Sequence, residues 1–180
     1  MVTYKELLDQ KIITRIEKVE KEMYVSFHQQ NYKIDLESAI NFLDLGNSKY
    51  AVIAGYYAVL NSTLWNLAKF FNLKISEKDF GVHTNCLIVL EEFVKDKELK
   101  KKILELLDLA KQEYTSFTTI KKDKEKTLPL MFKNSSEKRK RYTYYSLDRK
   151  LPGKDDMLNE SKLFIENVVK PYILIMENLK

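Results

Sequence analysis

The chain has 180 residues, 44% of them apolar and 12% aromatic, and its formal net charge is +5. This length predicts one domain and this apolar content excludes a disordered chain, while the lone cysteine, Cys86, and the two histidines exclude a disulfide framework and a structural zinc site. Four glycines and three prolines are few, which favours long helices.

Apolar residues at helical spacing predict a long N-terminal helix over residues 3–29. We expect its apolar stripe to face the core; the stripe comprises Tyr4, Leu8, Ile12, Ile16, Val19, Met23 and Phe27. A second helix is expected over 35–45, with Gly46 ending it. The third, over 49–73, is apolar on two faces and therefore belongs at the centre of a bundle. Gly55 and its alanine neighbours should let another helix approach it closely.

Further helices are expected around His83, which falls in the first turn of its helix, and over 96–118. The regular pattern then breaks, and we expect a long surface loop from Lys121 to Asn134. A short basic helix over 137–149 follows. The last helix is expected over 154–178, with a kink at Pro171. No strand pattern is visible. The sequence thus predicts an all-α fold, in which residues 1–180 form a single antiparallel bundle of about six to seven helices.

No apolar run approaches the ~18 residues that a membrane span needs. The first eight residues also lack the apolar core of a secretory signal. We therefore expect a cytoplasmic protein without membrane attachment.

Positive charge concentrates in one part of the chain. Residues 95–150 hold 17 Lys and Arg against 9 Asp and Glu, a net of +8. The densest cluster is Lys138, Arg139, Lys140 and Arg141, interleaved with tyrosines that include Tyr145, and Arg149 follows. Such a pattern is typical of phosphate contacts beside stacking surfaces. It predicts a nucleic-acid-binding or partner-binding segment; a solvated basic face with buried tyrosines is the alternative.

Few residues suggest catalysis. The glycines are too dispersed for a phosphate-binding loop, and the histidines, His28 and His83, are too far apart for a zinc-protease motif. We expect no cofactor and no metal. His83 replaces the leucine expected on an apolar stripe, so it is either a hydrogen-bonded core histidine or an acid–base group facing a cleft.

The run over residues 49–58, Lys-Tyr-Ala-Val-Ile-Ala-Gly-Tyr-Tyr-Ala, resembles the central helix of HEPN domains. His83 stands where related members place a histidine, and the runs Arg139–Tyr145 and Leu163–Val168 are similar to the family's Arg/Tyr segment and final helix. The resemblance spans about residues 35–169. It implies an all-α bundle, a homodimer, and a place in a toxin–antitoxin or defence system.

Many HEPN proteins are metal-independent ribonucleases that use an Arg followed by a His four to six residues later. No such pair exists in this chain. The resemblance therefore implies a non-catalytic module that binds RNA or a partner protein. One alternative is a ribonuclease toxin with His83 as acid–base group and Arg139 or Arg141 as phosphate clamp. The other is a structural partner of a nucleotidyltransferase.

Overall fold

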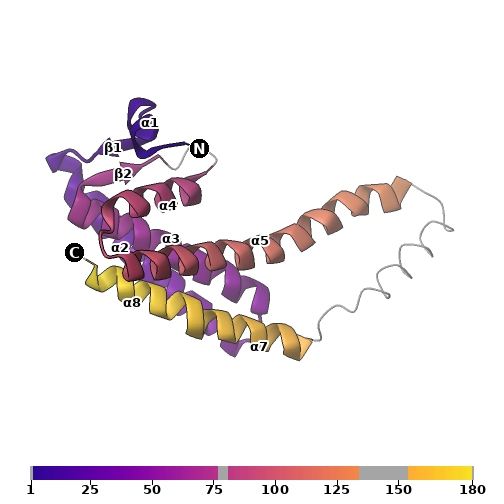
Figure 1. Ribbon diagram of the computed structural model, residues 1–180. Helices are drawn as coiled ribbons and strands as arrows, with labels where there is room; N and C mark the ends of the chain where they lie inside the picture. The colour runs from indigo at the N-terminus through magenta and orange to yellow at the C-terminus, as the bar shows by residue number, and fades with distance from the viewer. Residues whose placement is uncertain (1, 77–80, 134–153, 180) are drawn as a thin grey trace.

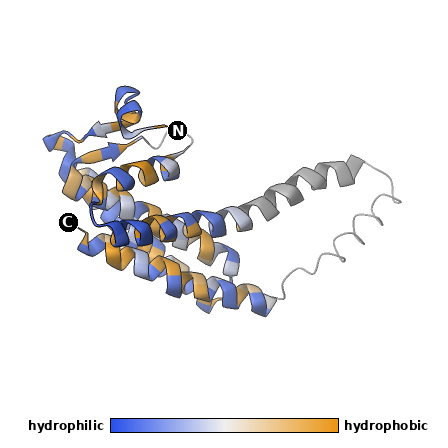
Figure 2. Ribbon diagram, in the orientation of Figure 1, coloured by the Kyte–Doolittle hydropathy of each residue, from blue (hydrophilic) through white to orange (hydrophobic). Residues whose placement is uncertain are grey.

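The computed structural model describes residues 2–76, 81–133 and 154–179. It confirms the predicted all-α fold class, with helices packed around one central helix (Figure 1). Figure 2 shows hydrophilic residues at the start of α5 and alternating hydrophobic and hydrophilic residues along the last helices. That alternation is typical of helices with one buried face.

The N-terminal region corrects our prediction of one helix over residues 3–29. It contains helix α1 (Tyr4–Asp9), strand β1 (Ile13–Arg15) and the start of a second helix. Lys11 adopts a left-handed conformation with φ of 57°, which ends helical geometry after α1. The β-branched residues that follow pair antiparallel with β2 (Leu73–Ile75), Ile13 opposite Ile75. The expectation that no strand exists was therefore also wrong.

Helix α2 (Lys18–Asp44) absorbs the separate helix predicted over 35–45. As expected, it ends before Gly46, which has a φ of 67°. Its buried residues are His28, Tyr32 and Ala39. Val19, Met23 and Phe27, which we expected in the core, are exposed. The part of the predicted stripe that falls on α2 therefore faces away from the core.

Helix α3 (Ser48–Phe71) is the centre of the bundle, as predicted, and most of its residues are buried. It packs against α2, α5 and the C-terminal helices. A Cβ atom at Gly55 would lie 2.6 Å from Ile165 Cδ1 and 3.0 Å from Phe164 Cε1. This confirms the close approach that we inferred from the small residues of α3.

Helix α4 (Val82–Phe93) is followed by α5 (Lys97–Lys133). Asp96 caps the start of α5, because its Oδ1 accepts a hydrogen bond from the backbone N–H of Leu99 at 2.8 Å. The loop predicted over 121–134 was wrong, because α5 stays helical to Lys133. Residues 121–126 are Lys, Asp and Glu without a breaker, so local propensity permits the continuation through Lys126; Pro129 lies within the part of α5 that follows. Figure 1 shows α5 extending beyond the packed body.

The last helix spans the predicted range but contains an irregular turn. It comprises α7 (Lys154–Phe164), the π-helical segment η1 (Ile165–Val169) and α8 (Lys170–Asn178). The backbone N–H of Lys170 donates to the carbonyl of Ile165, five residues back. Pro171 lacks an N–H, so the wide turn lies where the regular hydrogen-bond ladder is interrupted.

Polar contacts join the C-terminal helix to α3. Asn66 Nδ2 donates to the carbonyls of Met176 at 2.7 Å and Leu179 at 2.9 Å. The hydroxyls of Thr63 and Tyr172 lie 2.7 Å apart. These buried contacts fix the axial position of α8 against α3.

Candidate functional site

His83 lies in the first turn of α4, as predicted, and only 4% of its surface is exposed. Its ring stacks on Tyr56 with 6.1 Å between centroids. Neither ring nitrogen has a hydrogen-bond partner among the described residues. His83 is therefore a buried histidine for which the described residues provide no hydrogen bond.

Burial lowers the pKa of His83 to about 4, and the nearby Lys111 lowers it further than Asp108 raises it. The imidazole is consequently neutral at pH 7. A buried, neutral imidazole is poorly placed to exchange a proton with a substrate in solvent.

His83 is the inner end of an aromatic column that reaches the surface. Tyr56 stacks on Tyr114 with 4.3 Å between centroids, and Tyr114 contacts Tyr57 edge to face at 5.9 Å. Burial raises the pKa of Tyr56 well above its usual range, and a hydrogen bond with Tyr114, followed by burial, raises the pKa of Tyr57. Tyr56 and Tyr57 are thus held in their neutral forms.

A part-buried polar relay connects α2 to α3, and no sequence pattern predicts it. His28 Nδ1 lies 2.8 Å from Asn61 Oδ1, and Asn61 Nδ2 donates to Asp35 Oδ2 at 2.9 Å. Because an amide oxygen only accepts, Nδ1 of His28 carries the proton. Burial raises the pKa of Asp35, and the bond from Asn61 opposes that rise. The relay joins two adjacent helices through groups 26 and 33 residues apart.

The outer face of α2 carries an exposed apolar stripe, which we call the α2 stripe. It consists of Val19, Met23, Phe27 and Ile34, with Val19 95% and Met23 72% exposed. Spacings of four, four and seven residues keep these side chains within an arc of roughly 80°. His28, Tyr32 and Ala39 occupy the opposite, buried side of the helix.

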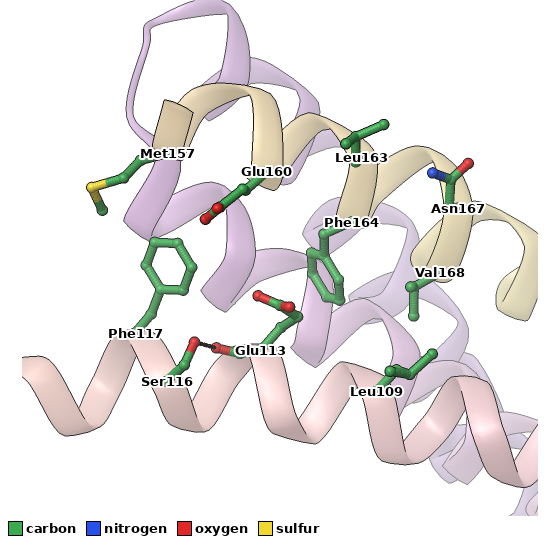
Figure 3. A pocket seen from close by; sticks show the side chains of 10 residues that line it. All are labelled: Leu109, Glu113, Ser116, Phe117, Met157, Glu160, Leu163, Phe164, Asn167 and Val168. Atoms are coloured by element: carbon green, nitrogen blue, oxygen red, sulfur yellow. Dashed lines mark hydrogen bonds between the residues drawn. The ribbon is translucent and has the colours of Figure 1, made fainter. Parts of the chain in front are cut away.

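A groove of about 530 Å³ lies between α5 and the α7–η1 segment (Figure 3). Helix α5 lines it with Leu109, Glu113, Ser116 and Phe117. The opposite wall is made by Met157, Glu160, Leu163, Phe164, Asn167 and Val168. Figure 3 shows the carboxylates of Glu113 and Glu160 pointing into the space between the two walls. Burial raises the pKa of Glu113, and the charge of Glu160 adds to that rise.

The predicted basic cluster lies outside the described residues. This applies to Lys138, Arg139, Lys140, Arg141, Tyr145 and Arg149, and to the short helix predicted over 137–149. The pairing of His83 with Arg141 therefore stays a prediction.

Among the described residues, no group of three or more His, Cys, Asp or Glu side chains could hold a metal ion. Within the same residues, every helix is too short or too polar to cross a membrane.

Comparisons with protein-family models, with curated proteins and with solved structures give no match. The resemblance to HEPN domains therefore stays a prediction carried by residues 35–169.

Proposed function

We propose that this chain is a HEPN-like helical module that binds a partner without catalysis, and that its first partner is a second copy of itself. The observation that carries the proposal is the α2 stripe. Large apolar side chains grouped on one exposed face are typical of interaction sites. Each gains about 1.5–3 kcal/mol on full burial, so covering four of them is a substantial driving force.

The charges beside the stripe favour a second copy. Lys18 and Glu22 flank its N-terminal end, and Lys33 and Glu37 flank its C-terminal end. A two-fold axis brings the same patch of both copies together, so that each contact occurs twice. Antiparallel pairing of α2 about Phe27 would set Glu22 opposite Lys33 and Lys18 opposite Glu37.

The environment of His83 supports a non-catalytic role. A histidine that is buried and neutral at pH 7 is poorly placed to protonate a leaving group in RNA. The chain also lacks the Arg/His spacing of active HEPN ribonucleases. Toxin–antitoxin or defence systems are the setting that the resemblance implies.

The molar mass of the protein in solution tests self-association. Light scattering coupled to size exclusion should give a dimer for the wild type, and Phe27→Glu should give a monomer. Leu174→Glu, on the exposed face of α8, is the matched control and should remain dimeric. A monomeric wild type, or a Phe27→Glu variant that still dimerises, would refute the proposal.

A charge swap tests the register. Glu22→Lys and Lys33→Glu should each weaken the dimer by placing like charges opposite each other. The double variant restores opposite charges and should recover wild-type affinity. If the two single variants and the double variant all dimerise with equal affinity, the antiparallel pairing of α2 is refuted.

RNA assays test the alternatives. Metal-independent cleavage that is lost in His83→Ala would replace this proposal with the ribonuclease. Salt-sensitive RNA binding that is lost when Lys138 to Arg141 are neutralised would make RNA a partner of the non-catalytic module.

A further inference from the structure

The groove between α5 and α7–η1 combines apolar walls with two carboxylates. Its walls are mainly apolar, with Phe117 and Phe164 buried along them. Two carboxylates, Glu113 and Glu160, nevertheless point into it (Figure 3). Neither forms an ion pair with any described residue. Partial burial and a neighbouring carboxylate both disfavour the charged form of a carboxyl group, so this arrangement has an energetic cost.

The charges of the groove determine what could relieve that cost. The pKa of Glu113 is raised because its partial burial, and then the charge of Glu160, oppose its ionisation. A cation placed between them would favour the charged form of both. A phosphate-bearing ligand would instead be repelled, which argues against nucleic acid at this surface.

The dimensions favour a segment of protein chain. The lining runs from Leu109 to Phe117 on α5 and from Met157 to Val168 on the other wall, about 12 and 16 Å at the rise of a helix. Leu109 and Leu163 are exposed at its edges, so the groove is open along its length. A short amphipathic segment fits such a surface through apolar anchors at regular spacing.

We propose that this groove binds an amphipathic segment of another protein that presents an arginine or lysine between large apolar side chains. The cation lies between Glu113 and Glu160, and the apolar side chains contact Phe117, Phe164 and Leu163. An arginine can offer each carboxylate a separate pair of N–H donors. This surface is separate from the α2 stripe, so the module would hold a second partner without disturbing its dimer.

Fluorescence anisotropy with a synthetic peptide tests the proposal. The probe is a labelled amphipathic dodecapeptide of leucine and arginine, and the control peptide has glutamine at every arginine. The wild-type protein should bind the first and not the second. Glu113→Gln with Glu160→Gln should weaken binding by at least about tenfold, since hydrogen bonds to charged groups are the stronger class.

Glu105→Gln is the control, because it removes a negative charge from an exposed position of α5 that does not line the groove. It should change affinity by less than twofold. Unfolding in urea checks that all variants are folded. Failure here is distinguishable from failure of the dimer, because the molar mass of each variant is measured without peptide.

Three results would overturn the proposal. The first is that neither the wild type nor any variant binds the probe. The second is equal binding by the wild type and the Glu113/Glu160 variant, or equal binding of the arginine and glutamine peptides. The third is binding only after Lys138 to Arg141 are neutralised, which would assign the groove to the chain's own basic cluster.

Discussion

Replacing His83 by leucine should change how the stability of this protein depends on pH. The pKa of His83 is lowered from 6.5 to about 4 in the folded protein. Between pH 6.5 and about 4, His83 is therefore protonated in the unfolded chain but not in the folded protein. A difference of about 2.5 pKa units corresponds to about 3 kcal/mol.

The sign follows from which state holds the proton. Above pH 6.5 the residue is neutral in both states and has no effect on the pH dependence. As pH falls from 6.5 to about 4, protonation favours the unfolded wild type, and its free energy of unfolding drops by up to about 3 kcal/mol. The leucine variant lacks this contribution. Its free energy of unfolding, relative to that of the wild type, should therefore increase as pH falls through this range.

Urea unfolding at pH 7, 6, 5 and 4.5 measures the effect. The carboxylates titrate in both proteins, so the difference between the two curves isolates His83. At pH 7 the variant should be equal to the wild type or more stable, because no described residue forms a hydrogen bond with the two buried ring nitrogens of His83. Parallel pH profiles, or a leucine variant that is markedly less stable at pH 7, would refute the buried, unbonded placement of His83.

Three other substitutions test the packing of α3 and of the C-terminal helix. Gly55→Ala gains about 1 kcal/mol of helix propensity, but the new Cβ would lie 2.6 Å from Ile165 Cδ1. We therefore expect the free energy of unfolding in urea to fall by about 1–2 kcal/mol. A stabilised variant would contradict the close approach of the two helices. Asn66→Ala removes the bonds to two carbonyls of the C-terminal end and should cost about 2–3 kcal/mol while speeding amide exchange in α8; unchanged exchange would count against this contact. Tyr32→Phe removes the 2.9 Å bond to Glu177 and should cost about 0.5–1.5 kcal/mol in thermal unfolding; no loss would mean that water replaces it.

A comparison of α3 and the C-terminal helix with α2 shows why an apolar pattern is an incomplete guide to burial. Residues 49–73 and 154–178 were predicted as helices with buried stripes, and α3 and α7–η1–α8 bury them. The same spacing in Val19, Met23 and Phe27 predicted burial that does not occur. A stripe that faces outward and one that faces the core have the same helical periodicity, so spacing alone does not distinguish them.

The candidate sites were predictable to different degrees. His83 was singled out because a polar residue interrupts an apolar stripe, and its burial explains that position without assigning it chemistry. The relay of His28, Asn61 and Asp35 had no sequence signal, since Asn61 lies on α3 and its two partners lie on α2. The groove carboxylates, Glu113 and Glu160, resemble any other surface glutamates until α5 and α7 are brought side by side.

The sequence by itself determined the helical class, the central place of α3, the break at Gly46 and the need for a small residue at Gly55. These depend on local propensity and periodicity, which act over a few residues. The tertiary structure alone decided that Ile13 pairs with Ile75, that α5 continues past Lys121, and that the α2 stripe faces outward. Each of these depends on which distant segments meet, and the free energy of such contacts is not encoded in the spacing of neighbouring residues.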